Sequence, residues 1–274
     1  MPRTAVVIAT FDQARWLRLA LRAWARQSIR PDLLVVADDG SGPETAEVVR
    51  EASAEHVRQE RIADQFGKCR AVNAAVRRAR ELGAEWLFFT DGDCLPARDL
   101  LARHLAVTRP GRYAAGGVVR FSKAVSFQLD DSTVDSFQFE RLPGDKRRYA
   151  LPRSVGRAVD ALLTRRTPFK GGNSSCWLAD FVRVNGYDER FGWGVEDKEL
   201  GERLQHAGVR GFSLRYSAPV FHLWHERPYV RDDIVARNRH ILAQTRATRA
   251  SATPSGIDTK TGERSSLGSL PRGS

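Results

Sequence analysis

The sequence predicts an α/β fold in which a mostly parallel sheet is flanked by helices, in a single domain of two closely joined halves. Short apolar runs of the kind that form buried parallel strands lie at residues 4–9, 33–37 and 86–90. Longer stretches with apolar residues at helical spacing lie between these runs. Strands that alternate with helices indicate βαβ units and therefore a parallel sheet.

The elements between these strands follow from the same periodicity. Leu17 and Leu21, for example, are spaced to share one face of a helix. The expected elements are helices over 13–27, 44–54 and 68–82, and a weak strand over 56–59. Ligands of such sheets bind beyond the carboxyl ends of the strands, so the residues that follow each strand are candidates for a site.

The regular alternation stops after Gly116 and Gly117. Residues 122–168 are polar and charged, and we interpret them as an inserted region over the site. The elements expected from there on are helices near 131–141, 154–165 and 178–185, a helix from 197 to about 205, and a strand over 211–216. The resulting division is 1–118, 119–245 and a tail over 246–274, whose Ser, Thr, Gly, Arg and Pro content predicts disorder.

Composition limits the class of protein. A chain of 274 residues with 42% hydrophobic residues is long enough to bury a core. It has no run of about 18 apolar residues, which a membrane span requires, and its beginning lacks the layout of a signal peptide. Cys69, Cys94 and Cys176 are too few and too scattered for a disulfide framework or a zinc cluster. A reducing, cytoplasmic setting is the default expectation.

The formal net charge is +11, and most of the basic residues are arginine. This balance suits anionic partners, such as nucleotide phosphates, acidic glycans, anionic lipid head groups or nucleic acid. Arginine on solvated helix faces would give the same composition. Charge alone therefore does not select a function.

The strongest candidate for chemistry is Asp91-Gly92-Asp93, which directly follows the apolar strand at 86–90. Two carboxylates that emerge together into a cleft make a hard oxygen site for Mg²⁺ or Mn²⁺. Such a metal would neutralise a departing diphosphate. The alternative for the tripeptide alone is an ordinary Asp-Gly turn, and its position after a buried strand favours the metal site.

Further candidates follow the other strands. Thr10-Phe11-Asp12 ends the first strand, and Asp38-Asp39-Gly40-Ser41 ends the second. Their side chains could bind a base or ribose, or could simply cap a turn and a helix. Gly67, Lys68 and Arg70 open a helix, where backbone N–H groups and basic side chains favour phosphate.

The second half contributes Trp193, Glu196, Asp197, His222 and His225. A carboxylate at a helix start lies in a positive dipole, which keeps it ionised and able to accept a proton, although the same pair also serves helix-start electrostatics. Trp193 lies between two glycines, so it could move and exclude water from a site. The alternative is a core aromatic, although the flanking glycines argue against a rigid core position. An imidazole would complete a metal site and favour manganese-like ions over Mg²⁺.

In this order the motifs resemble a known family. Residues 9–12 (Ala-Thr-Phe-Asp), 37–41 (Ala-Asp-Asp-Gly-Ser), 67–73 (Gly-Lys-Cys-Arg-Ala-Val-Asn) and 89–93 (Phe-Thr-Asp-Gly-Asp) resemble family 2 of the inverting glycosyltransferases, GT2. Residues 171–174 (Gly-Gly-Asn-Ser), 192–197 (Gly-Trp-Gly-Val-Glu-Asp) and 222–225 (His-Leu-Trp-His) are similar to the C-terminal region of β-1,4-galactosyltransferases and chondroitin-polymerase-type enzymes. The resemblance covers residues 4–228 and implies the Rossmann-like GT-A fold, with a nucleotide-sugar-binding half over 1–118 and an acceptor-binding, catalytic half over 119–245.

The resemblance also implies roles for individual residues. Asp197 takes the place of the catalytic base. The donor set is Thr10, Phe11, Asp12, Asp39, Gly67, Lys68, Arg70, Asp91 and Gly92. The acceptor set is Gly172, Asn173, Trp193, Gly194 and Glu196. The metal set is Asp91, Asp93, His225 and His222, with Asp93 and His225 as first choices and His222 as the alternative histidine.

The implied reaction is the Mn²⁺- or Mg²⁺-dependent transfer of one sugar, with inversion, from a nucleotide sugar that is expected to be UDP-linked to a hydroxyl of a glycan or glycolipid. No Gln-x-x-Arg-Trp segment of processive synthases occurs, which favours single transfer. The basic charge suggests an anionic acceptor in polysaccharide biosynthesis, peripheral association with the inner membrane face, and no role for nucleic acid. Residues 122–168 match no pattern of the family.

Two other functions remain open at this point. A nucleotidyltransferase would also use paired carboxylates and a metal, but it needs a glycine-rich phosphate loop after the first strand, and Thr10-Phe11-Asp12-Gln13 is not one. A non-catalytic polyanion-binding protein would fit the net charge. It would have no use for Asp91, Asp93 and Asp197 in one cleft, because carboxylates repel phosphate unless a metal is present.

Overall fold

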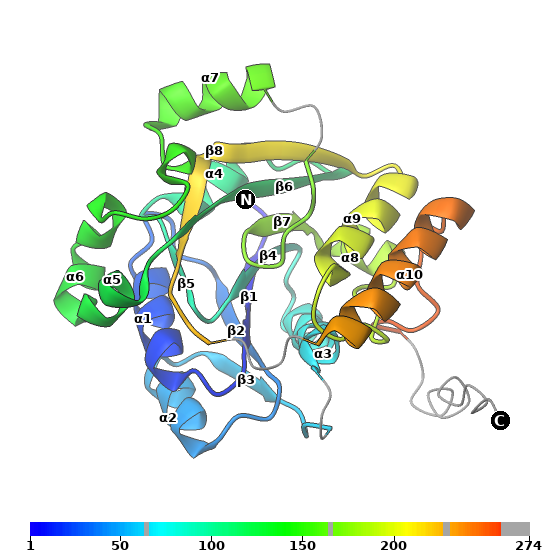
Figure 1. Cartoon of the computed structure of the whole chain (residues 1–274), viewed down its shortest axis with the longest axis horizontal. Coiled ribbons are helices and arrows are strands. Elements are labelled where there is room, and N and C mark those ends of the chain that lie inside the picture. Colours follow the sequence, from blue (N-terminus) through cyan, green and yellow to red (C-terminus); the bar gives the residue numbers. More distant parts are fainter. Residues whose placement is uncertain (63–65, 164–166, 227–230, 259–274) are drawn as a thin grey trace.

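The computed structural model describes residues 1–62, 66–163, 167–226 and 231–258. It contains one sheet of eight strands in the order β3-β2-β1-β4-β7-β6-β8-β5, with helices on both faces (Figure 1). Within this sheet β7 and β5 run opposite to the other strands. The predicted α/β fold with a mostly parallel, helix-flanked sheet is therefore confirmed.

The first half follows the predicted elements closely. In chain order it contains β1 (Thr4–Thr10), α1 (Ala14–Ala25), β2 (Leu33–Asp38), α2 (Pro43–Glu51), β3 (Glu55–Arg58), α3 (Lys68–Glu81) and β4 (Trp86–Asp91). β3, β2, β1 and β4 are neighbours and pair in parallel. The residues that follow β1, β2 and β4 consequently meet at one edge of the sheet.

The chain after β4 contains several elements that the sequence did not predict. In chain order it contains β5 (Cys94–Pro96), α4 (Leu100–Leu105), β6 (Arg112–Arg120), α5 (Lys123–Gln128), α6 (Asp131–Asp135), the 3₁₀ turns η1 (Gln138–Arg141) and η2 (Arg147–Tyr149), α7 (Arg153–Leu163), β7 (Ser174–Trp177), α8 (Leu178–Arg183), α9 (Glu196–His206), β8 (Arg210–His222) and α10 (Asp232–Thr248). The helix expected over 131–141 is interrupted at Phe137, whose φ is 55°.

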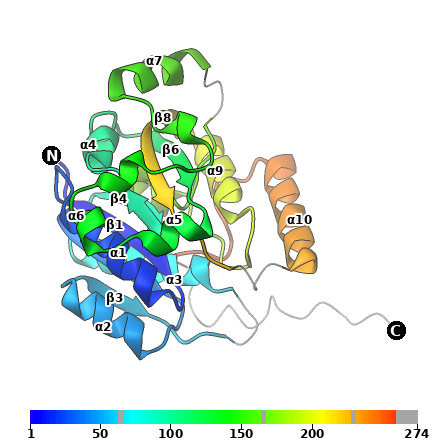
Figure 2. The ribbon, with the colours of Figure 1, turned by 60° about the vertical axis from the view of Figure 1, so that its left-hand side comes forward.

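Each face of the sheet has its own core because side chains alternate along the strands. Along β1, Val6 and Ile8 belong to the core formed with α1 and α4, whereas Ala5 and Val7 belong to the core formed with α3, α8, α9 and α10. Figure 2 shows α1, α2, α5 and α6 on one side of the sheet, with α9 and α10 on the other. The sheet is thus held rigidly from both faces, which fixes the strand ends.

The region over 122–168 is more ordered than expected. α5, α6 and η1 lie against α1, where Arg22 binds both carboxylate oxygens of Asp135 at 2.5 and 2.6 Å and Arg18 lies 2.8 Å from Asp131. α7 lies against β8, and its buried Asp160 accepts hydrogen bonds from that strand. The interpretation of 122–168 as an insertion over the site is corrected: its described part covers the sheet beside the site.

The expected tail begins too early at residue 246. α10 continues to Thr248, and the chain then packs against the segment that follows α8, where the N–H of Ile257 donates to the carbonyl of Asn185 at 3.0 Å. Ile257 is 3% exposed, and its carbonyl accepts from Arg77 at 2.8 Å. The rest of the tail, 259–274, lies outside the described residues. Among the described helices none is long and apolar enough to cross a membrane. Cys69, Cys94 and Cys176 are buried free thiols.

Candidate active site

A cleft of about 580 Å³ opens where β1, β2 and β4 end, and it is bounded opposite them by the start of α9 and by α10. Most of the residues that the sequence predicted for a site line it. They are Thr10, Phe11, Asp39, Lys68, Asp91, Asp93, Gly172, Trp193, Gly194, Glu196, Asp197, His222 and His225. Residues from distant parts of the chain therefore meet in one cleft, while their roles stay predictions. None of the described residues of 122–168 lines the cleft.

Asp93, His222 and His225 form a compact group of potential metal ligands. Each offers one ligand atom, and these atoms lie within 4.8 Å of one another. Nε2 of His225 is 3.0 Å from Oδ2 of Asp93, and Nε2 of His222 is 3.7 Å from Oδ1. The pairing of β5 with β8 produces this arrangement, since Cys94 lies opposite His222 and Leu223 donates its N–H to the carbonyl of Asp93 at 2.8 Å.

The chemistry of this group suits a divalent cation. One carboxylate and two imidazoles favour Mn²⁺-like ions over Mg²⁺. Although burial opposes it, the charge of His222 and the hydrogen bond of His225 lower the pKa of Asp93 to about 2, so its carboxylate is ionised. Asp91, Asp93 and Cys94 form a second group. Burial, followed by the charge of Asp93, raises the pKa of the Cys94 thiol well above its usual value, which makes this thiol a poor ligand.

Asp91 is paired with a lysine. Nζ of Lys68, at the first position of α3, lies 2.7 Å from Oδ1 of Asp91. Burial alone would lower the pKa of Lys68, but the charges of Asp91 and Asp197 outweigh it and raise that pKa well above its ordinary value. Lys68 is therefore a fixed positive charge between two carboxylates of the cleft, on the side where a phosphate would approach α3.

Asp197 is held on the opposite wall, in the first turn of α9. The hydroxyl of Tyr187 donates to Oδ1 of Asp197 at 2.9 Å. Gly171 allows this carboxylate to approach, because a Cβ at position 171 would lie 2.5 Å from Oδ1 of Asp197 and 3.0 Å from Nζ of Lys68. Neither Tyr187 nor Gly171 was among the predicted site residues, since their roles depend on contacts between distant segments.

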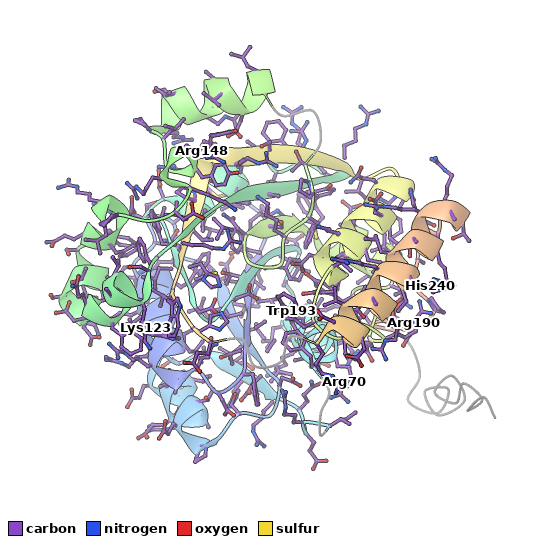
Figure 3. All side chains as sticks on the ribbon, viewed as in Figure 1. Arg70, Lys123, Arg148, Arg190, Trp193 and His240 are labelled. Carbon is purple, nitrogen blue, oxygen red and sulfur yellow. The ribbon has the colours of Figure 1, made fainter. Side chains whose placement is uncertain are left out.

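The turn before α9 positions Trp193 and Glu196. Val195 has a φ of 62°, an unusual conformation for a β-branched residue, and the N–H of Gly194 donates to Oε2 of Glu196 at 2.9 Å. Asn238 of α10 donates to the carbonyls of Trp193 and Gly194 at 3.1 and 2.9 Å. Trp193 lies in this turn, beside α10 (Figure 3). Burial, then the charge of Asp197, raises the pKa of Glu196 to about 7.

The wall made by β1 and β2 has a different character. Oγ1 of Thr10 is buried without a hydrogen-bond partner among the described residues, and the guanidinium of Arg61 stacks 3.7 Å from the ring centre of Phe11. Asp39 accepts hydrogen bonds from the N–H of Gly67 at 2.8 Å, from Arg61 at 2.7 Å and from Gln59 at 2.6 Å. Asp39 therefore also fixes the loop that precedes α3.

Five predicted residues do not line the cleft. Asp12 accepts from the N–H of Gly42. Gly67 donates to Asp39, and Gly92 donates to the carbonyl of Ala9. Arg70, in the first turn of α3, donates to the carbonyl of Glu60 (Figure 3). The assignment of Asn173 to the acceptor is corrected: its side chain is fully buried and donates to the carbonyls of Gly117 and Ala218, so it joins β6 to β8.

Other residues of the cleft were not predicted. They are Ala9, Gln13, Ala37, Phe66, Cys94, Val118, Arg120, Lys170, Val195, Lys198, Val235 and Arg239. Several belong to β6, to the loop before β7 and to α10, segments that the sequence periodicity did not predict. In a sequence rich in arginine, a single basic residue cannot be recognised as a site residue from the sequence alone.

An α/β sheet with an acidic and histidine-containing cleft at its strand ends is characteristic of the GT-A class of fold. The profile of the family described as "Glycosyltransferase like family 2" matches residues 2–250. The chain therefore belongs to glycosyltransferase family 2, which confirms the family predicted from the sequence. No curated protein matches the chain at a significant level of sequence similarity.

Solved glycosyltransferases share the fold. GalNAc-T7 in complex with UDP, GalNAc and Mn²⁺ superposes with a TM-score of 0.64 at 15% identity, over 89% of this chain and 48% of that chain. Mannosyltransferase PcManGT from Pyrobaculum calidifontis, in complex with GDP-Man and Mn²⁺, has a TM-score of 0.60 and 21% identity. The match covers 92% of this chain and 66% of that chain. S. aureus TarS 1–349 in complex with UDP-GlcNAc has a TM-score of 0.61 and 14% identity, over 88% of this chain and 66% of that chain. The chain spans about half of GalNAc-T7 and less than two thirds of the other two.

Proposed function

We propose that the protein is a metal-dependent, inverting glycosyltransferase that moves one sugar from a nucleoside diphosphate sugar, with UDP preferred, to a hydroxyl of a glycan or glycolipid. The observation that carries the proposal is the convergence of Asp93, His222, His225 and Asp197 on one cleft. Membership of family 2 supports sugar transfer. Solved neighbours in complex with Mn²⁺ and with UDP- or GDP-linked compounds support the class of donor.

Asp93, His222 and His225, which we call the metal group, have side chains that suit a metal-dependent reaction. Asp93, His222 and His225 would hold the cation, with Asp91 beside them. When bound, the cation would neutralise the charge on the diphosphate that leaves. Lys68 adds a fixed positive charge at the start of α3, where the helix dipole also favours phosphate.

Asp197 is the proposed general base. The acceptor hydroxyl attacks the anomeric carbon on the face opposite the diphosphate, so a new carbon–oxygen bond forms while the bond to the phosphate oxygen breaks. The hydroxyl proton passes to Asp197. Tyr187 occupies Oδ1 of Asp197, which leaves Oδ2 for this proton.

The remaining walls would bind the two sugars and the nucleotide. Thr10, Phe11 and Asp39 lie at the ends of β1 and β2, on the side proposed for the base and ribose. Trp193 and Glu196 are proposed to contact the acceptor, and the Trp193 ring would exclude water that could hydrolyse the donor. Asn238 keeps the backbone of this turn in place.

Ligand-dependent thermal stabilisation tests the donor and the metal. UDP with Mn²⁺ should raise the melting temperature by several degrees, because saturation at a hundredfold excess over Kd adds roughly 2.7 kcal/mol. UDP without metal should have little effect, and GDP with Mn²⁺ should have a smaller one. Stabilisation by heparin or DNA alone would instead support a polyanion-binding protein and would overturn the proposal.

Donor hydrolysis and transfer test the base. Screening nucleotide sugars with Mn²⁺ identifies the donor, and Asp197→Asn keeps the shape of the side chain but removes its capacity to accept a proton. We expect transfer to fall by about 10²–10⁴-fold while UDP–Mn²⁺ binding is retained. Full transfer activity in Asp197→Asn would exclude this residue as the base.

Location and acceptor are part of the same proposal. A cytoplasmic protein at the inner membrane face, acting on a precursor of polysaccharide biosynthesis, fits the net charge of +11. Flotation with vesicles of anionic and of zwitterionic lipid would test the membrane association. Equal recovery with both vesicle types would argue against an electrostatic contribution.

A further inference from the structure

Arginine and lysine side chains lie in or near a part of the cleft to which the proposed function assigns no residue. Arg120 and Lys170 line the cleft. Arg215 and Lys146 lie close enough to Lys170 for their charges to act on it. We call Arg120, Lys146, Lys170 and Arg215 the basic cluster. Within the described part of the chain none of the four has an ion-pair partner.

The backbone holds the cluster together. Nζ of Lys170 donates to the carbonyl of Gly116 in β6 at 2.6 Å. Arg120, at the end of β6, exchanges backbone hydrogen bonds of 3.2 and 2.8 Å with Asp145, the residue before Lys146. Arg215 lies where β8 bulges away from β6, opposite Gly116 and Gly117. Segments from four parts of the chain thus bring their cations near one another.

The nearby buried carboxylate does not pair directly with the cluster. Asp160 of α7 is 6% exposed, and it accepts from Ser213 at 2.9 Å, from Ser217 at 2.7 Å and from the N–H of Tyr216 at 3.1 Å. Its oxygens are therefore used to stabilise the bulge of β8. Burial, together with the charge of Arg215, lowers the pKa of Lys170 to about 8, although the charge of Asp160 opposes this lowering. The cluster thus places four cations near one buried carboxylate.

The position of the cluster indicates which part of a substrate would reach it. Arg120 pairs with His222 across β6 and β8, so the cluster adjoins the metal group. Thr10 and Asp39, on β1 and after β2, lie on the other side of β4 and β7 in the sheet. A nucleotide at β1 and β2 and a diphosphate at Asp93 would leave the sugar moieties nearest to the basic cluster.

We propose that the basic cluster is a subsite for an anionic group, a carboxylate or a phosphate, carried by one of the sugar substrates. This inference rests on the proposed function, because it assigns a substrate group to the same cleft. Two guanidinium groups and two ammonium groups can bind a carboxylate or a phosphate through charge-assisted hydrogen bonds, and arginine can do so with two parallel bonds. A neutral sugar would offer no opposite charge to these four cations.

Binding of small probes to the full chain tests the proposal. With the donor site saturated by UDP and Mg²⁺, saturation-transfer NMR would compare glucuronate and glucose 6-phosphate with glucose. We expect at least one anionic probe to bind about tenfold more tightly than glucose. Arg120→Gln and Arg215→Gln should each remove most of this preference. Arg50→Gln, which changes an arginine of α2 that is 74% exposed and lies far from the cleft, should leave it unchanged.

A second arm distinguishes an anionic donor from an anionic acceptor. Calorimetry with Mn²⁺ would compare UDP-glucuronate with UDP-glucose. Tighter binding of UDP-glucuronate that depends on Arg120 and Arg215 would place the anion on the donor sugar. The absence of any preference in both arms, or a preference that both variants retain, would overturn the subsite. Failure of the proposed function is recognised separately, as loss of metal-dependent UDP binding in the unmodified protein.

Discussion

The hydroxyl of Tyr187 donates a hydrogen bond of 2.9 Å to Oδ1 of Asp197, and Tyr187 is 1% exposed. Burial, followed by the charge of Asp197, raises the pKa of this tyrosine well above its usual value. The phenol therefore remains a donor at every physiological pH. It fixes the orientation of the carboxylate that we propose as the base.

Tyr187→Phe should lower kcat for transfer about tenfold while KM for the donor changes little, because a hydrogen bond to a charged group contributes about 1.5–3 kcal/mol. Steady-state kinetics with the identified donor would measure this. Tyr113→Phe is the matched control: that hydroxyl is also in a buried region, and it donates to the carbonyl of Thr167 outside the cleft. An equal loss in both variants would show that Tyr187 acts only through stability.

The histidines of the metal group provide a second prediction. His222→Ala and His225→Ala should each weaken the Mn²⁺-dependent stabilisation by UDP by at least about tenfold in apparent metal affinity. His240→Ala is the control, since His240 is exposed on α10 (Figure 3). Titration of Mn²⁺ followed by thermal unfolding would measure the affinities. Unchanged affinity in both site variants would remove the histidines from the ligand set.

The close approach at Gly171 provides a third prediction. In Gly171→Ala the added Cβ would lie 2.5 Å from Asp197 Oδ1, so the carboxylate must move. Transfer should fall at least about tenfold, since small displacements of reacting groups are costly. In Gly42→Ala the Cβ would lie 3.9 Å from Asp12, an ordinary contact, and activity should be retained. Normal activity in Gly171→Ala would contradict the proposed position of the base.

The pKa of Glu196, raised by burial and by Asp197 to about 7, predicts a pH dependence of stability. The folded protein holds this proton more tightly than the unfolded chain, whose glutamates titrate near 4.5. The favourable neutral form is fully present below about pH 4.5, and its advantage is lost as pH rises towards 7. In metal-free buffer with EDTA, we therefore expect Glu196→Gln to be more stable than the original protein at pH 8. The difference in stability between the two proteins should be smaller at pH 5. An equal difference at both pH values would refute the shifted pKa.

The N-terminal half of the fold could be predicted because its signals are local. The apolar run at 86–90 and the helical spacing of Leu17 and Leu21 each specify one element. Asp91, Asp93 and Asp39 then follow from the rule that parallel strands end at one edge. The later strands gave weaker signals. β5 has three residues, and β7 is the short polar segment Ser174–Trp177.

The parts of the site that could not be predicted depend on contacts between distant segments. Asn173 lies in the Gly-Gly-Asn pattern that is expected of a binding residue. Its side-chain amide nevertheless donates to carbonyls of β6 and β8. Lys170 and Arg120 are ordinary basic residues in sequence, and only the pairing of β6 with β8 brings them together. Tyr187 and Asn238 act through hydrogen bonds whose partners no periodicity reveals.

The pairing of β5 with β8 has a consequence for how the protein unfolds. Asp93 belongs to the first half of the chain, and His222 and His225 come near its end, so the ligand set exists only when the strand at the sheet's far edge is in register. If the proposed site binds a metal, the free energy of binding would add to that of folding, because the unfolded chain has no preformed site. We therefore expect a chelator to lower the free energy of unfolding as well as to stop sugar transfer. Neither half of the chain alone should bind Mn²⁺.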